Sequence, residues 1–257
     1  MMTEQDIAQF VQQYFLPFAR IASMLMVVPV IGSRVISPRV RLAMAMLLTL
    51  IAVPLLPAFN APPMLSFNMI PILLREVAVG TLMGFCFQVV FHVFVLSGQF
   101  IAMKMGLGFA MMNDPTNGVQ TTVVSQFFLI LTTLMFVAFN AHLYLISMLI
   151  QSFQTLPIGS GMLNTDKLYM LVQLGAWMFA SALSFALPVL TSLLVINMAF
   201  GVMSRAAPQL NIFAIGFPFT LICGLALIWL GLGNYLEAFE KNLDVGFNFV
   251  HELIEAP

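Results

Sequence analysis

One stretch of the sequence, residues 168–204, reads LYMLVQLGAWMFASALSFALPVLTSLLVINMAFGVMS and contains no Asp, Glu, Lys or Arg. A continuous helix of this length extends about 55 Å, because each helical residue rises about 1.5 Å. The hydrocarbon core of a bilayer is only about 30 Å thick. The stretch therefore predicts a membrane helix that either tilts strongly or continues to a place where other protein replaces lipid. A kink at Pro188 does not remove the excess length, so the second alternative predicts a large assembly.

The composition of the whole chain agrees with this stretch. Hydrophobic residues make up 61% and charged residues 7% of the 257 residues, and the mean hydropathy is +1.03. Soluble proteins carry about 25% charged residues, so a soluble enzyme is excluded. The net charge of −1 provides no surface for binding phosphates, which argues against a nucleic-acid partner. The acidic opening Met-Met-Thr-Glu-Gln-Asp is unlike a secretory signal peptide, so we expect an integral membrane protein without a cleaved leader.

Six main helices are predicted from the apolar runs, and Pro- and Gly-rich stretches separate them. Their expected bounds are 8–31, 39–57, 70–104, 121–152, 167–204 and 211–236, and an acidic amphipathic tail follows. If all six helices cross the membrane, the loops at 32–41, 104–120 and 202–211 lie on one side. These loops hold more Lys and Arg than the opposite ones, which favours a cytoplasmic position for them.

Two predicted helices carry polar stripes, the first within an arc of about 80° and the second within about 60° at 100° per residue. The first stripe comprises Thr81, Gly84, Gln88, His92 and Gln99, and the second comprises Thr122, Gln126, Thr133, Asn140, Tyr144, Ser147 and Gln151. Lipid cannot satisfy amide and imidazole groups, so the stripes face protein or water. One interpretation is packing within the chain, and the other is contact with further subunits or an aqueous lumen. The candidates for the second interpretation are Gln88, His92, Gln99, Gln126, Thr133 and Asn140.

Charged residues are rare inside the predicted helices. Arg20 interrupts an apolar run, where a charge costs about 2.5–3.5 kcal/mol. We expect it to have a partner or a wet environment, or to reach the membrane surface. The Arg75-Glu76 pair either contacts another subunit or marks the membrane interface. His92 and His142 are interpreted as buried, hydrogen-bonded histidines rather than metal ligands.

Motifs of intramembrane proteases and nucleotide-binding loops are absent from the sequence. We therefore predict no catalytic, cofactor or metal site, and an intramembrane enzyme is the weakest hypothesis. Cys86 and Cys223 form neither a disulfide framework nor a metal-binding pattern. A proton-coupled carrier of a small solute is the main alternative to a structural subunit, because Lys104, Asp114 and His92 could titrate. Carriers commonly contain repeated halves, and no such symmetry is found here.

The segment from Lys104 to Gln120 combines turn chemistry with apolar side chains. Gly106 and Gly108 disfavour regular helix, and residues 114–118 read Asp-Pro-Thr-Asn-Gly, a strong turn signal. Between them lie apolar residues that include Met111 and Met112, whose flexible side chains pack against irregular surfaces. Taken alone, the segment is a connection buried against neighbouring helices.

Several stretches resemble one known family. The most specific is GVMSRAAPQLNIFAIGFP, residues 201–218, which resembles the signature of the FliR family of the flagellar type III export gate. MGLGFA (105–110) with Asp114-Pro115, FNAHL (139–143), LPIG (156–159) and the Arg34 to Leu50 segment resemble the same family. The signature positions are Arg205, Pro208, Gln209, Asn211, Gly216 and Pro218. Injectisome homologues (the SctT family) share the Ala-Pro-Gln-Leu-Asn core, so an injectisome gate subunit stays an alternative.

The resemblance implies an all-α membrane protein of long, kinked hydrophobic helices in hairpins, within a helical pore assembly. It implies a FliP-like portion over residues 1–165 and a FliQ-like hairpin with an acidic tail over 166–257. The implied partners are FliP, FliQ, FlhB and FlhA, together with membrane lipid and the unfolded flagellar proteins that pass the pore. The implied location is the flagellar basal body in the bacterial inner membrane, with part of the assembly on the periplasmic side.

The resemblance also implies a role for residues 106–118, because the matching segment of the family forms a plug across the closed export pore. The plug residues expected on this basis are Gly106, Leu107, Gly108, Phe109, Met111, Met112, Asp114, Pro115 and Gly118. The resemblance implies no enzymatic activity and no cofactor.

Overall fold

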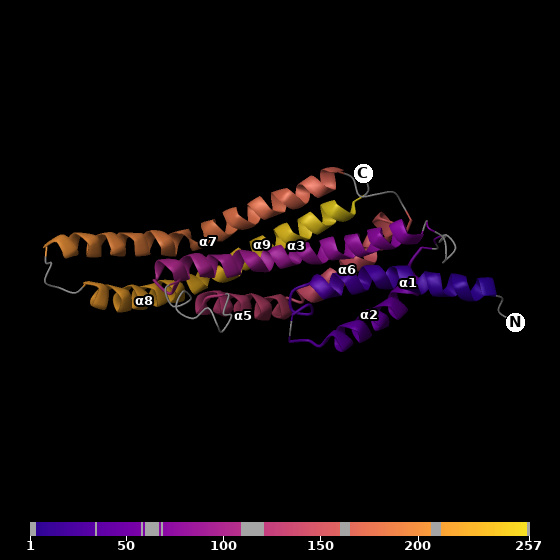
Figure 1. The fold of residues 1–257 in the computed structure, drawn as a ribbon, viewed down its shortest axis with the longest axis horizontal. Coiled ribbons are helices and arrows are strands. Elements are labelled where there is room, and N and C mark those ends of the chain that lie inside the picture. The colour runs from indigo at the N-terminus through magenta and orange to yellow at the C-terminus, as the bar shows by residue number, and fades with distance from the viewer. Residues whose placement is uncertain are drawn as a thin grey trace. The chain divides into compact units, whose positions relative to one another are not determined.

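A computed structural model describes residues 4–33, 35–57, 59, 67, 69–108, 121–159, 165–206 and 212–255. All regular structure within these ranges is helical, as predicted (Figure 1). The α-helices are α1 (Glu4–Val27), α2 (Pro38–Ala52), α3 (Met69–Lys104), α5 (Val123–Ala138), α6 (Ala141–Thr155), α7 (Thr165–Ala206), α8 (Ile212–Gly231) and α9 (Tyr235–Ile254). Short 3₁₀ turns follow α2, at Val53–Leu55, and α8, at Leu232–Asn234.

The chain forms two compact units, and each of them collects distant parts of the sequence. The first unit comprises Met1–Val89, Phe136–Gly175 and Asp244–Pro257, and the second comprises Val90–Met135 and Ala176–Leu243. Both units therefore draw on residues before and after position 165. The predicted division into a FliP-like portion and a FliQ-like hairpin is a division along the sequence, and it stays a prediction.

In the first unit, α1 packs against α2 and against the first half of α3 (Figure 1). Glycines on α3 bring the two backbones together. A Cβ at Gly80 would lie 2.1 Å from the carbonyl oxygen of Arg20, and a Cβ at Gly84 would lie 2.9 Å from that of Met24. Such small residues allow close helix approach, as is typical of membrane helices. Gly84 of the first polar stripe therefore packs within the chain.

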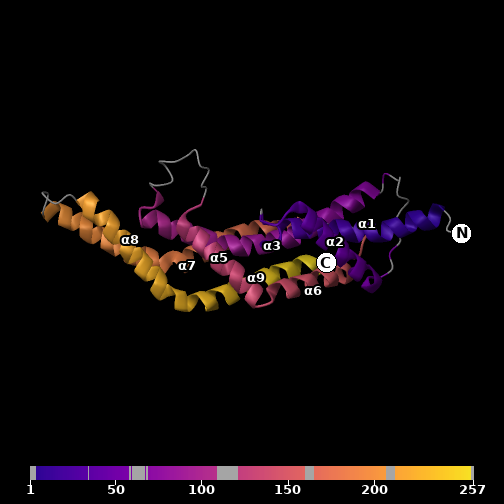
Figure 2. The ribbon, with the colours of Figure 1, turned by 90° about the horizontal axis from the view of Figure 1, so that it is seen from below.

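In the second unit, α7 and α8 run side by side as a hairpin (Figures 1 and 2). The rings of Phe200 and Phe219 meet edge to face with centroids 5.4 Å apart. Most large side chains of this hairpin are exposed, including Trp229 at 73% and Val202 at 70%. Apolar surface of this extent is stable only where lipid or other protein covers it.

The single helix predicted over 121–152 is wrong, because the structure divides it into α5 and α6. The two helices are bent by 68° at the break. Asn140 has a φ of 54°, in the left-handed region that ends a right-handed helix. Asn adopts this conformation more readily than most residues. The second polar stripe is therefore not one continuous face.

Four helical segments are long and apolar enough to cross a membrane, or five if the bent pair α5–α6 counts as one span. The four are Pro38–Leu55, Met69–Lys104, Tyr169–Ala206 and Ile215–Ile254, by length and composition among the described residues. The assumption of six membrane spans is therefore wrong for the described residues. The cytoplasmic position inferred from loop charges assumed six spans, so it is no longer supported. α7, with 42 residues, exceeds a bilayer core at about 1.5 Å per residue.

Candidate functional site

The predicted plug begins where α3 ends. Gly106, Leu107 and Gly108 belong to the described residues and follow α3 directly. The remaining predicted plug residues lie outside the described residues: Phe109, Met111, Met112, Asp114, Pro115 and Gly118. We call residues 105–107 the root of the segment, and Gly108 follows them.

A Schellman motif ends α3 at the root. The Leu107 N–H donates to the carbonyl of Ala102 at 3.0 Å, and the Gly106 N–H donates to the carbonyl of Met103 at 3.2 Å. Gly106 has a φ of 86°, which the motif requires and which glycine adopts without steric cost. The predicted break at Gly106 is confirmed, and backbone hydrogen bonds set the direction in which the chain leaves α3.

The root packs on α8. Met105 is fully buried and lies over Gly224, while Gly106 lies against the ring of Phe217. Gly106 and Phe217 belong to two of the stretches that resemble the family, residues 105–110 and residues 201–218. Sequence reasoning treated these stretches as independent motifs, and no signal along the chain indicated that they touch.

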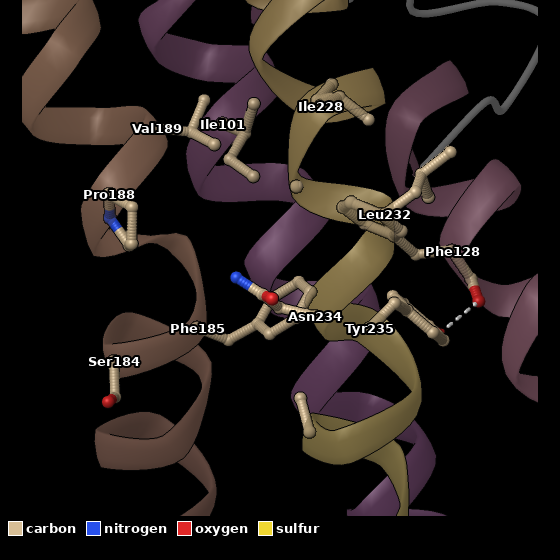
Figure 3. Close-up of a pocket in the computed structure, with 12 residues that line it drawn as sticks. Ile101, Phe128, Ser184, Phe185, Pro188, Val189, Ile228, Leu232, Asn234 and Tyr235 are labelled. Carbon is tan, nitrogen blue, oxygen red and sulfur yellow. Dashed lines mark hydrogen bonds between the residues drawn. The ribbon is translucent and has the colours of Figure 1, made fainter.

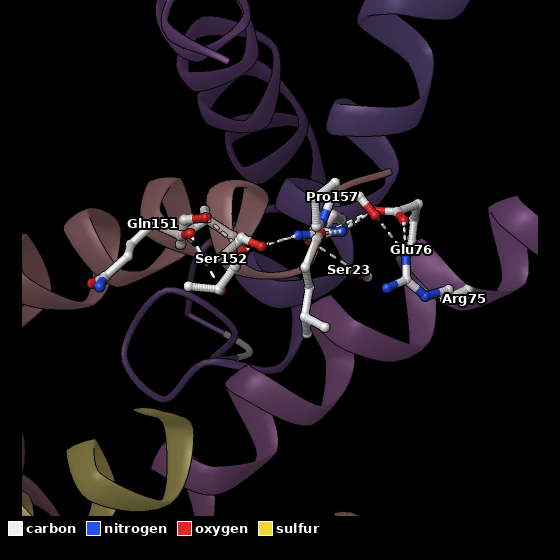
Figure 4. Close-up of polar contacts among 10 residues, drawn as sticks. Ser23, Arg75, Glu76, Gln151, Ser152 and Pro157 are labelled. Atoms are coloured by element: carbon white, nitrogen blue, oxygen red, sulfur yellow. Dashed lines mark hydrogen bonds and ion pairs between the residues drawn. The ribbon is translucent and has the colours of Figure 1, made fainter. Parts of the chain in front are cut away.

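A buried ionic cluster joins α1, α3 and α6 in the first unit (Figure 4). Arg20 Nε donates to Glu76 Oε2 at 2.6 Å. Its Nη1 and Nη2 each donate at 2.9 Å to backbone carbonyls at the end of α6, those of Ser152 and Leu156. The guanidinium carbon lies 4.2 Å from the centre of the Phe153 ring. Both charged side chains are 0% exposed, so the cluster satisfies every branch of the guanidinium without water.

This cluster decides between the alternatives for Arg20 and Glu76. Arg20 has a partner inside the protein, as one prediction required, and does not reach the surface. Glu76 pairs within the chain, which corrects the expectation that it contacts another subunit or only marks the interface. Arg75 Nη1 also donates to Glu76 Oε1 at 3.1 Å. The sequence signal for this cluster was Arg20 alone in one apolar run and the adjacent Arg75-Glu76 pair between two others, because a buried charge requires an opposite charge.

The start of α7 is tied to the end of α9 within the first unit. Lys167 Nζ donates to the carbonyl of Leu253 at 2.9 Å and to the carbonyl of Glu255. A cation at a helix C-terminus also interacts favourably with the helix dipole. Burial lowers the pKa of Lys167, the charge of Arg75 lowers it further, and Glu255 acts in the opposite direction.

The residues of the polar stripes differ in exposure. On α3, Gln88 and Gln99 are half-buried and His92 is exposed. On α5 and α6, Gln126 and Asn140 are exposed and Thr133 is half-buried. The interpretation of His92 as a buried histidine is therefore wrong. His142 is half-buried, and its Nδ1 has no hydrogen-bond partner among the described residues, so this nitrogen lacks the hydrogen bond that we expected.

An aromatic cluster and an adjoining cavity lie in the second unit (Figure 3). Tyr235 stacks on Phe128 with centroids 5.8 Å apart, and its hydroxyl lies 2.6 Å from Thr132 Oγ1. The cavity measures about 230 Å³ and lies between α7 near Pro188 and the turn that contains Asn234. Its described lining contains no Asp, Glu, His, Lys, Arg or Cys side chain.

The signature positions are only partly described. Arg205, Gly216 and Pro218 lie on α7 and α8, where Arg205 and Pro218 are exposed. Pro208, Gln209 and Asn211 lie outside the described residues. Among the described residues, no group of three or more His, Cys, Asp or Glu side chains could hold a metal ion.

Comparison with known proteins identifies a family that matches this chain. A family described as bacterial export proteins, family 1, matches residues 11–245. The flagellar biosynthetic protein FliR of Pectobacterium carotovorum is 38% identical over 249 residues, covering 97% of this chain and 94% of the relative. FliR of Escherichia coli K12 is 37% identical over 227 residues, covering 88% and 87%. FliR of Bacillus subtilis is 27% identical over 220 residues, covering 84% of each chain.

These matches extend over the regions whose motifs carried the resemblance, and they confirm it. The relatives have nearly the same length as this chain, and the helical, apolar architecture agrees with a membrane-embedded export component. The chain therefore belongs to the bacterial export protein family 1, the family of the flagellar biosynthetic protein FliR.

Proposed function

We propose that this protein is a structural subunit of the flagellar type III protein export gate in the bacterial inner membrane. In this role it forms, with FliP and FliQ and beside FlhB and FlhA, the pore through which unfolded flagellar proteins leave the cytoplasm. The observation that carries the proposal is the similarity to FliR proteins over 97% of the chain. The names of these relatives state a role in flagellar biosynthesis.

The exposed side chains support a place inside an assembly. Gln126 on α5 and Asn140 at the start of α6 are exposed. Gln126 Nε2 donates to Thr121 Oγ1 at 2.6 Å, and lipid provides no hydrogen bonds for the other polar groups of the two amides. The exposed apolar surface of the α7–α8 hairpin also requires a cover. Subunit contacts and an aqueous lumen satisfy both requirements at once, whereas a monomer surrounded by lipid satisfies only the second.

Within this function, residues 106–118 occlude the pore in its closed state. The segment leaves α3 at a turn with defined backbone hydrogen bonds, and its sequence combines glycines with apolar side chains. Glycines permit displacement, and methionines pack against irregular surfaces. No catalytic step is required of this chain, because its contribution is a gated passage.

Deletion of residues 107–113 tests this proposal. The deleted chain is co-expressed with FliP and FliQ, and the yield of the purified complex is compared with the ion permeability of cells that overproduce the gate. We expect normal assembly and increased ion leakage. A complex that assembles normally and stays as ion-tight as wild type rules out the plug.

The same purification separates the gate from a small-solute carrier. A gate subunit elutes from detergent as a large complex with other small membrane proteins. A stable monomer whose melting temperature rises with a small solute supports the carrier instead. Complementation of non-motile cells that lack FliR distinguishes a flagellar from an injectisome subunit.

A further inference from the structure

We propose that Phe217 and Gly224 of α8 form a seat that positions the end of α3, and with it the root of the 106–118 segment. The proposal deepens the gate function and rests on it, because the segment matters only if it occludes a pore. It adds α8 as an element that controls the closed position. The seat is built entirely from described residues of the second unit.

The first half of the seat is an aromatic ring against a glycine. A Cβ built on Gly106 would lie 2.9 Å from Cδ2 and 3.0 Å from Cε2 of Phe217. The ring therefore touches the backbone where a side chain would otherwise point. Gly106 also has a φ of 86°. Glycine is therefore needed here for two reasons, because it adopts the positive φ of the helix end and leaves room for the ring on α8.

The second half of the seat is a hollow that receives a methionine. A Cβ built on Gly224 would lie 2.5 Å from Cγ, 2.7 Å from Sδ and 2.8 Å from Cε of Met105. Three atoms of one side chain thus occupy the space that any other residue at position 224 would need. Met105 is 0% exposed, so its side chain must shift within the packed interior to make room for a residue with a side chain at position 224.

The two contacts act on the same helix end from one face of α8. Positions 217 and 224 are seven residues apart, and residues at i and i+7 lie on one side of a helix about two turns apart. Met105 and Gly106 are adjacent in the chain and hold the Schellman turn that directs the segment. A shift of α8 therefore changes the direction in which the chain leaves α3. It does not alter only the packing on the side of α3.

Contacts that only stabilise the fold and contacts that position the segment predict different effects on ion permeability. If the contacts only stabilise the fold, a change at position 224 lowers thermal stability or yield and leaves an assembled gate ion-tight. If they position the segment, an assembled gate with a disturbed seat leaks ions. Ion permeability at normal complex yield therefore separates the two.

The test uses the full chain co-expressed with FliP and FliQ. Gly224→Ala inserts a methyl group into the Met105 side chain, and we expect a several-fold rise in ion leakage. Adding Met105→Ala vacates the same space and should return leakage toward the wild-type value. Gly231→Ala is the matched control on α8, because no described atom outside its chain neighbours and its own helix turn lies within 4 Å of a Cβ at that position. Normal leakage of an assembled Gly224→Ala complex overturns the proposal.

A second variant covers the case in which Gly224→Ala fails to assemble. Phe217→Ala removes the ring without introducing a clash, and its complex should also leak. If this complex assembles and is as ion-tight as wild type, the seat is wrong. Comparison with the 107–113 deletion separates the two proposals. A leaking deletion beside tight seat variants refutes the seat alone, whereas a tight deletion refutes the plug.

A probe of the root itself gives an independent readout. Leu107→Cys, in a chain with Cys86→Ala and Cys223→Ala, reports the accessibility of the root to a thiol reagent. The labelling rate should change several-fold when Gly224→Ala is added and should stay constant with Gly231→Ala. An unchanged rate with Gly224→Ala shows that α8 does not position the root, whatever the segment does in the pore.

Discussion

The two units of this protein hold helix ends in place by opposite means. In the first unit, the end of α6 is held by a buried ionic cluster, in which Arg20 bridges Glu76 and the carbonyls of Ser152 and Leu156. In the second unit, the end of α3 is held by shape, through the root against Phe217 and Gly224. Loss of one member of a buried charge cluster leaves the other charge unpaired, whereas a shape contact depends on the volume of the side chains that meet.

The largest effect should follow from removal of one charge. Glu76→Ala leaves the guanidinium of Arg20 buried without its carboxylate, and breaking a buried pair in this way costs about 3–5 kcal/mol. We expect loss of the folded chain, measured as complex yield and melting temperature in detergent. The double change Arg20→Met with Glu76→Met removes both charges and should recover part of the loss. Near-normal stability of Glu76→Ala would contradict the contrast between the two units.

A smaller effect should follow from added volume in the ionic unit. Gly80→Ala places a Cβ 2.1 Å from the carbonyl oxygen of Arg20, and overpacking of this kind costs about 1–3 kcal/mol. Gly175→Ala is the control in the same unit, because nothing lies within 4 Å of its Cβ. Alanine is favoured over glycine inside a helix by about 0.5–1 kcal/mol, so the control should be neutral or stabilising. Equal melting temperatures for the two variants would show that α1 and α3 separate at little cost.

The smallest effect should follow from removal of a hydroxyl in the aromatic cluster. Tyr235→Phe loses the hydroxyl that lies 2.6 Å from Thr132 Oγ1 and donates to the carbonyl of Phe128 at 3.2 Å. The Thr132 hydroxyl still donates to the same carbonyl at 2.7 Å. A neutral hydrogen bond contributes about 0.5–1.5 kcal/mol, and the ring contacts are kept. Melting of the purified complex measures the change, with Tyr14→Phe as a second tyrosine variant outside this cluster. A loss as large as that of Glu76→Ala would mean that polar contacts, and not shape, hold the second unit.

The sequence by itself determined the class of this protein. Charge-free runs such as 168–204 require an apolar environment, because so many apolar side chains cannot be exposed to water. This requirement holds whichever helices pack beside the run. The same reasoning named a partner as one of three alternatives for Arg20 and predicted the end of α3 near Gly106, because both follow from single residues. The family followed from the stretch at 201–218, whose length and specificity need no tertiary information.

Only the tertiary structure decided which residues meet. The pairing of Arg20 with Glu76 spans two predicted helices, and several acidic residues elsewhere in the chain offered the same charge. The bend at Asn140 depends on one left-handed residue, which propensity does not distinguish from an ordinary polar position in a helix. The contact of Gly106 with Phe217 joins residues more than a hundred positions apart. Such contacts depend on the packing of whole helices against one another, and packing is a property of the assembled fold rather than of any segment.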